Sequence, residues 1–101
     1  MSKSDESKFL DGKKVLFKVA ASSNVSKIAG AIAKHLEDGL DVELVAIGAG
    51  AVNQSVKAIA AARALTAPSG KNLCCVPAFR TENTESESKT SIHLIIYDMR
   101  F

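Results

Sequence analysis

Two stretches of this chain pass from an extended apolar run, through a turn of small or polar residues, into a helical pattern. Residues 13–36 read KKVLFKVAASSNVSKIAGAIAKHL, and residues 42–65 read VELVAIGAGAVNQSVKAIAAARAL. Two such units in succession predict parallel strands that are joined by a right-handed crossover through the first helix. This repeat restricts the chain to an α/β architecture.

The hydrophobic periodicity predicts the remaining elements. Strands are expected at residues 13–21, 41–48, 71–79 and 90–101, and helices at residues 25–39 and 52–65. Gly39 is expected to end the first helix, and Gly30 inside it suggests close packing against a neighbouring element. Residues 80–89 read RTENTESESK, lack apolar side chains and are expected to form a long hairpin loop.

The order β-α-β-α-β-β predicts a two-layer α/β sandwich in which both helices cover one face of a four-stranded sheet. No helix remains to cover the other sheet face, so a partner subunit is a candidate cover. A chain of 101 residues fits one domain. We place this domain at residues 13–101, after a Ser- and Lys-rich flexible tail at residues 1–12.

Charge and composition narrow the class of protein only weakly. The formal net charge of +2 does not by itself indicate nucleic-acid binding, although lysines are concentrated in the first third of the chain. An ordinary mixed-charge surface is the alternative. The adjacent Cys74 and Cys75 fit reduced strand residues rather than a disulfide. With no secretory signal and no apolar run long enough to span a membrane, we expect a soluble cytoplasmic protein that has no membrane partner, with the nucleus or nucleoid also open.

The glycine turn at residues 48–55, GAGAVNQS, lies where many proteins bind a phosphate, between a strand and a helix. It does not match the dinucleotide-binding pattern G-x-G-x-x-G, because Asn53 occupies the third glycine position. Main-chain amides at such a helix start can still bind an anion. The equally weighted alternative is that Gly48 and Gly50 only provide tight geometry between strand and helix.

The turn at residues 20–27, AASSNVSK, has a similar composition. If the two preceding strands are parallel and adjacent, both helix starts lie at the same edge of the sheet. Such a rim, with Lys27 and Lys57 beside it, fits a phosphodiester backbone better than a single small phosphate. Two ordinary helix N-caps are the alternative.

Enzyme chemistry has little support in the sequence. His35 and His93 are isolated, no His/Cys/Asp cluster has the spacing of a metal site, and no G-x-S-x-G motif is present. We therefore expect no catalytic site, no metal and no cofactor.

Four blocks, taken in order, resemble the stage V sporulation protein S family: KVAASSNVSKIAGAIAKHL, AIGAGAVNQSVKAIAAARAL, APSGKNLCCVPAF and SIHLIIYD. The resemblance implies the fold of the Alba chromatin and RNA-binding proteins and of the C-terminal domain of translation initiation factor three. It also implies a small, usually dimeric, non-enzymatic nucleic-acid-binding protein that is tied in bacteria to spore development.

Carried over from Alba proteins, the binding surface comprises residues 22–27, 48–57 and 80–89. The chain departs from the Alba pattern in the first loop, where Ser-Ser-Asn stands in place of lysines, and in the hairpin, where Glu82, Glu85 and Glu87 repel phosphate. Both departures weaken a role in DNA compaction. The candidate nucleic-acid-binding residues are Lys14, Lys18, Ser22, Ser23, Asn24, Lys27, Gly48, Gly50, Asn53, Gln54, Lys57, Arg63 and Arg80.

The leading hypothesis is a nucleic-acid-binding protein, for RNA or DNA, that acts as a homodimer or higher homo-oligomer in development or regulation. The alternative is a self-assembling scaffold or protein-interaction module that has the same fold but little affinity for nucleic acid. The near-neutral charge and the acidic hairpin favour the alternative.

Overall fold

The structure is a computed structural model that describes residues 7–83 and 86–99, with side chains at residues 12–81 and 86–99. In chain order it contains strands β1 (Ser7–Asp11) and β2 (Lys14–Val19), helix α1 (Val25–Glu37), strand β3 (Asp41–Ala46), helix α2 (Ala49–Thr66), the short 3-10 helix η1 (Ala67–Ser69), and strands β4 (Leu73–Asn83) and β5 (Ser88–Asp98).

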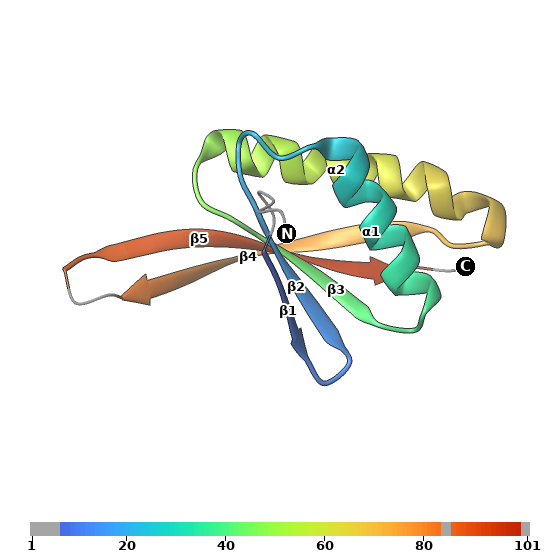
Figure 1. Ribbon diagram of the computed structural model, residues 1–101, viewed down its shortest axis with the longest axis horizontal. Coiled ribbons are helices and arrows are strands. Elements are labelled where there is room, and N and C mark those ends of the chain that lie inside the picture. The colour runs from blue at the N-terminus through green and yellow to red at the C-terminus, as the bar shows by residue number, and fades with distance from the viewer. Residues whose placement is uncertain (1–6, 84–85, 100–101) are drawn as a thin grey trace.

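The strands form one mixed sheet in the order β1-β2-β3-β5-β4. Strands β2 and β3 pair in parallel, and the other neighbouring pairs are antiparallel. Both helices lie on one side of this sheet (Figure 1). The predicted two-layer sandwich with the order β-α-β-α-β-β is therefore confirmed, with one further strand ahead of it.

The core lies between the helices and the sheet. The alternation that predicted the first strand is confirmed, because Val15, Phe17 and Val19 are all buried under the helices. Helix α2 is rich in alanine, which has a small side chain, so it can lie close to both the sheet and α1. The buried core residues of the other elements include Ile28, Ile32, Val42, Leu44, Ala58, Ile59, Ala62, Leu94 and Ile96.

The prediction of a flexible tail at residues 1–12 is wrong for residues 7–11, which form β1. Strand β1 pairs antiparallel with β2 from Ser7 opposite Lys18 to Asp11 opposite Lys14. The turn between them contains Gly12, whose φ of 64° suits a tight hairpin. The Asp-Gly pair at residues 11–12 was the sequence signal for this hairpin. The rest of the predicted tail, residues 1–6, lies outside the described residues.

The prediction of a loop over residues 80–89 is also wrong for most of its length. The β4–β5 ladder continues through Arg80 opposite Ser91 as far as Asn83 opposite Ser88. The hairpin thus projects beyond the helix layer (Figure 1). The described side chains of this arm at residues 80–81 and 86–90 are exposed, so it can be a strand pair without apolar side chains, and hydrophobic periodicity therefore did not reveal it.

The helix boundaries follow local capping signals. The side chain of Asn24 caps the start of α1, and Gly39, with a φ of 83°, ends the helix as predicted. Gly30 is exposed and a Cβ there would meet nothing within 4 Å, so the expected close packing is absent at this position. Helix α2 begins at Ala49 rather than at residue 52, because Gly48 already serves as its N-cap.

Candidate nucleic-acid interface

The first part of the site is the turn between β2 and α1. Ser23 is buried, and its Oγ accepts a hydrogen bond from the main-chain nitrogen of Ala20 at 2.9 Å. Asn24 Oδ1 accepts one from the nitrogen of Lys27, also at 2.9 Å. Both predicted site residues therefore hold the turn in shape, as an ordinary N-cap does. Ser22 and Lys27 are exposed beside them.

The second part is the glycine turn before α2. Gly48 has φ 94° and ψ 156°, a conformation that is open almost only to glycine. A Cβ on Gly50 would lie 2.8 Å from the Cβ of Ala21, so the turn after β2 packs directly on the start of α2. Both glycines thus have the geometric role that was the alternative interpretation of this turn. The residues Gly48, Ala49 and Gly50 at this helix start are exposed, whereas Ala51 is buried.

A hydrogen bond joins the two parts. The side-chain nitrogen of Gln54 donates to the main-chain oxygen of Ser23 at 2.9 Å. Because β2 and β3 are parallel neighbours, the helices that follow them start at the same end of the sheet. We call residues 20–27 together with residues 48–57 the helix-start rim.

The electrostatics of the helix-start rim favour an anion. Neither first turn, VSKI in α1 or AGAV in α2, contains an acidic residue to neutralise the positive end of the helix dipole. Lys27, Asn53 and Lys57 are exposed. Lys57 is the ninth residue of α2, about 12 Å along the axis from its start at 1.5 Å per residue, and so lies deeper in the helix than expected.

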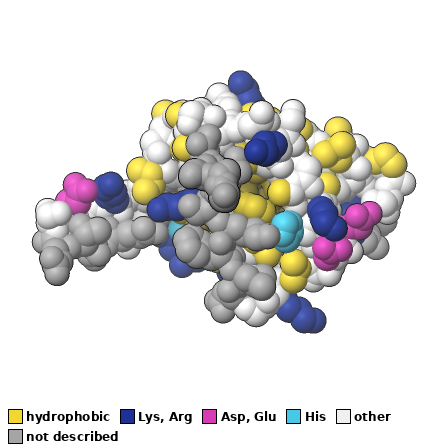
Figure 2. Space-filling model, in the orientation of Figure 1, with side chains coloured by type: hydrophobic (Ala, Val, Ile, Leu, Met, Phe, Trp, Pro, Cys, Tyr) yellow, Lys and Arg dark blue, Asp and Glu magenta, His cyan; other side chains and the backbone are white. Residues whose placement is uncertain are grey.

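Four predicted cations lie away from the rim. Arg63 lies about 21 Å along α2 from its start, where its Nη2 donates to the side chain of Asn72 at 3.1 Å. Lys14 and Lys18 lie on β2, on the sheet face opposite the helices, and Arg80 lies on the β4–β5 arm. The structure therefore does not unite the thirteen predicted residues into one surface. Lysine and arginine side chains are also scattered over the face shown in Figure 2, without forming one continuous patch among the described residues.

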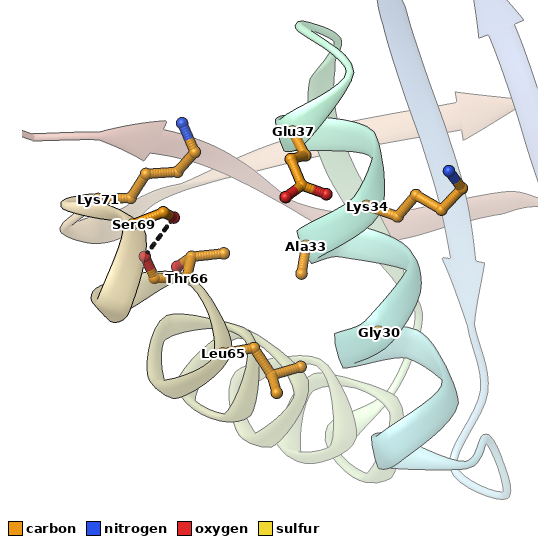
Figure 3. Close-up of a pocket in the computed structure, with 8 residues that line it drawn as sticks. All are labelled: Gly30, Ala33, Lys34, Glu37, Leu65, Thr66, Ser69 and Lys71. Carbon is orange, nitrogen blue, oxygen red and sulfur yellow. Dashed lines mark hydrogen bonds between the residues drawn. The ribbon is translucent and has the colours of Figure 1, made fainter.

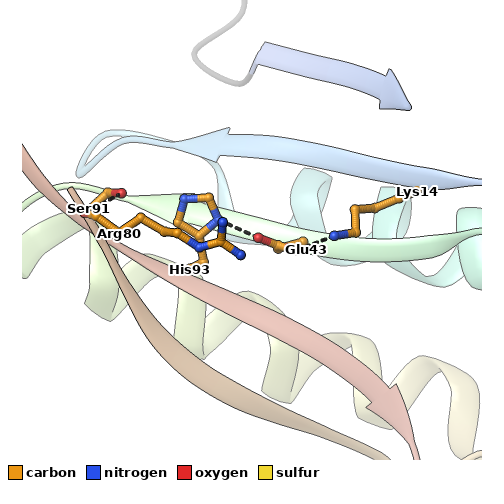
Figure 4. Close-up of polar contacts among 5 residues, drawn as sticks. All are labelled: Lys14, Glu43, Arg80, Ser91 and His93. Carbon is orange, nitrogen blue, oxygen red and sulfur yellow. Dashed lines mark hydrogen bonds and ion pairs between the residues drawn. The ribbon is translucent and has the colours of Figure 1, made fainter. Parts of the chain in front are cut away.

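Sequence reasoning missed a buried charged group on the sheet face opposite the helices. Glu43 of β3 is only 2% exposed, its Oε1 lies 2.9 Å from Lys14 Nζ, and its Oε2 accepts a hydrogen bond from His93 Nδ1 (Figure 4). Burial by itself would raise the pKa of Glu43, but the hydrogen bond from His93 and the contact with Lys14 outweigh it and lower the pKa. The available signal was the carboxylate of Glu43, which has apolar residues on both sides in β3.

A groove of about 270 Å³ opens at the other end of the helix layer, between α1 and the segment after α2. Gly30, Leu65 and Lys71 are among its lining residues, and Glu37 and Lys34 flank it on α1 (Figure 3). None of the predicted site residues lines this groove.

The fold and the rim define a class, the small two-layer α/β proteins of Alba-like architecture. The family model of stage V sporulation protein S matches residues 15–99. The chain belongs to the stage V sporulation protein S family, which makes it a small sporulation-related protein.

The described residues contain no group of three or more His, Cys, Asp or Glu side chains that could hold a metal ion. No helix in the part of the chain that the structure describes is long and apolar enough to cross a membrane.

Proposed function

We propose that this protein is a non-enzymatic nucleic-acid-binding protein, for RNA or DNA, and that it binds the phosphate backbone at the helix-start rim. The observation that carries the proposal is the joining of two helix starts, both free of acidic residues in the first turn, by the hydrogen bond from Gln54 to Ser23. Helix starts with exposed amides attract phosphate groups, and exposed lysines add to that attraction.

The chemistry of the rim favours binding without sequence preference. Its donors are main-chain amides, short polar side chains and the lysines Lys27 and Lys57, which suit phosphate oxygens rather than the edges of particular bases. If each lysine neutralises one phosphate, the rim contributes about −1.4 on single strands and about −1.8 on duplex DNA to the slope of log K against log salt. Binding of this kind is weak and salt-sensitive.

The test is fluorescence anisotropy with labelled single-stranded RNA, single-stranded DNA and duplex DNA over a series of salt concentrations. Salt-sensitive binding to at least one of the three supports the proposal, and the preferred ligand identifies the polymer. Absence of binding to all three at low salt contradicts it and favours the scaffold alternative.

We also propose that the protein acts as a homodimer or higher homo-oligomer. Phe79 is 77% exposed on β4, beside Pro77 and Ile92, with which it lines an apolar groove of about 250 Å³. The exposed side chain of Val56 on helix α2 adds to the apolar surface. Apolar surface of this kind is typical of contacts between proteins.

Sedimentation velocity over a range of protein concentrations tests the assembly. The Phe79→Ser variant is expected to shift the population toward monomer, whereas Leu65→Ser, at the far end of α2, serves as the control for loss of an exposed apolar side chain. Assembly that is unchanged in Phe79→Ser contradicts a role for the groove. Repeating the measurement with an oligonucleotide separates the two functions, because a pure scaffold assembles to the same extent in its presence.

A further inference from the structure

The sheet face opposite the helices, here called the open face, combines several cations with one carboxylate. Pairing across the strands places Lys18, Val45 and His93 in one row of this face, with Glu43 in the next row. Arg80 lies opposite Ser91, one row further along, and its side chain extends over the same face towards His93 and Glu43 (Figure 4).

The carboxylate on this face already contacts two neighbouring side chains. One oxygen of Glu43 contacts Lys14 and the other accepts from His93. Lys18 and Arg80 are exposed, and neither forms an ion pair with another residue that the structure describes. Two positive side chains of the open face therefore lack an internal counter-charge within the described part of the chain.

His93 supplies a second, independent observation. It is 7% exposed, and its Nε2 is buried with no hydrogen-bond partner among the described residues. Its Nδ1 is held by Glu43, which fixes the orientation of the ring. A buried polar atom without a hydrogen-bond partner is unfavourable. A ligand that supplies such a partner to Nε2 of His93 is therefore bound more favourably.

These groups lie at the same end of the sheet as the helix-start rim. Lys18 is two residues before Ala20, where the first part of the rim begins, and Val45 is three residues before Gly48, where the second part begins. The rim and this end of the open face are therefore two sides of one end of the sheet. A flexible polymer that leaves the rim can continue onto the open face.

We propose that single-stranded nucleic acid passes from the helix-start rim around the end of the sheet, and that Lys18, Arg80 and Nε2 of His93 hold a backbone phosphate on the open face. This inference rests on the proposed function. A single strand can make the turn between the two sides, whereas duplex DNA, with a persistence length of about 150 base pairs, is too stiff to follow it. Arg80 swings aside or joins the phosphate as it enters, since its side chain is exposed.

The contact of a phosphate with Nε2 of His93 requires a proton on both ring nitrogens. Because Nδ1 donates to Glu43, Nε2 can donate to a phosphate only in the protonated imidazole. The charged groups around it on the described strands are Lys14 and Lys18 from β2, Glu43 from β3 and Arg80 from β4.

The first test uses the unmodified protein. The ring-nitrogen chemical shifts of its two histidines are measured by NMR while a single-stranded oligonucleotide, or inorganic phosphate, is added. Nε2 of His93 is expected to shift with the oligonucleotide, whereas His35 on α1 is the internal control. A shift with inorganic phosphate as well marks a general phosphate site. An unchanged His93 signal in a sample where anisotropy shows binding overturns the inference.

The second test compares two charge-matched double variants by anisotropy. Lys18→Gln/Arg80→Gln removes the two open-face cations, and Lys34→Gln/Lys71→Gln removes two lysines that line the groove at the other end of the helices. The first pair is expected to reduce the steepness of the salt slope on single strands by about 1.4, and the second to leave it unchanged. If both pairs bind like the wild type while rim variants lose binding, the inference fails and the proposed function stands. If the wild type binds nothing, both fail.

Discussion

The side chain of Gln54 donates a 2.9 Å hydrogen bond to the main-chain oxygen of Ser23, thirty-one residues earlier in the chain. Ser23 is buried, and its own side chain holds the turn that precedes α1. One bond thus connects the start of α2 to the start of α1. The helix-start rim depends on this connection as well as on the packing of Gly50 against Ala21.

Replacing Gln54 with leucine is expected to lower the free energy of unfolding by about 1–3 kcal/mol, because the oxygen of the buried Ser23 loses its partner while leucine fills a similar volume. Urea denaturation measures the change. Asn53→Leu is the control, since Asn53 is exposed on the same turn and its side chain makes no hydrogen bond to another described residue. Equal stability of the two variants would contradict the structural role of Gln54.

Two glycine-to-alanine substitutions are expected to act in opposite directions. Gly30→Ala should raise stability by about 0.5–1 kcal/mol, since the site is an exposed helix interior with open space around the new methyl group. Gly50→Ala has a similar gain in helix propensity but forces a contact of 2.8 Å with the Cβ of Ala21. Overpacking of this kind costs about 1–3 kcal/mol, so the net change is a loss of stability.

Thermal unfolding of both alanine variants tests this pair of expectations. The turn that carries Ala21 cannot shift easily, because hydrogen bonds between Ala20 and Ser23 close it on both sides. A Gly50→Ala variant as stable as Gly30→Ala would show that the turn after β2 does not pack against α2 as described.

Acid is expected to destabilise the protein partly through Glu43. The pKa of this carboxyl is lowered in the folded protein from its ordinary value of 4.5, so the unfolded chain binds the proton more tightly. The contribution of Glu43 to stability is therefore present above about pH 4.5 and is lost as the pH falls through the lowered folded value. In Glu43→Gln the free energy of unfolding should be lower at neutral pH and should fall less steeply in acid.

The control for the acid experiment is Asp41→Asn, which removes the same charge from an exposed position of the same strand. It is expected to follow the wild-type curve of stability against pH. Denaturant unfolding between about pH 3 and pH 7 measures both variants. A Glu43→Gln curve that is parallel to the wild type would show that the buried contacts to Lys14 and His93 do not couple folding to protonation.

The fold could be predicted from the sequence wherever one face of a helix or strand is buried, because the apolar residues of that element then recur at a regular spacing. The alternation at residues 15–19 and the helical stripe at residues 25–36 predicted β2 and α1, because each of these elements has one buried face. The same signal fails where a strand pair leaves the core, as in the β4–β5 arm, and where a short edge strand has no alternation of apolar and polar residues, as in β1, SKFLD. In those segments strand pairing rather than burial determines the structure.

The rim was predictable in outline for a related reason. Two parallel strand–helix units place their helix starts at one edge of the sheet whatever their side chains are. The N-cap role of Asn24 was one of the two interpretations of this turn, whereas the hydrogen bond from Gln54 to the main chain of Ser23 was not predictable from the sequence. The contact between Glu43 and His93 joins residues fifty positions apart and required the register of β3 against β5.

The most direct test of the central claim is the binding of the Lys27→Ala/Lys57→Ala double variant to the preferred oligonucleotide at two salt concentrations. The matched control is Lys34→Ala/Lys71→Ala, which removes the same charge at the other end of the helices. We expect the rim variant to lose most of its salt-sensitive binding, while the control binds like the wild type. Equal losses in the two variants would show that binding follows net charge rather than the rim, and would contradict the account.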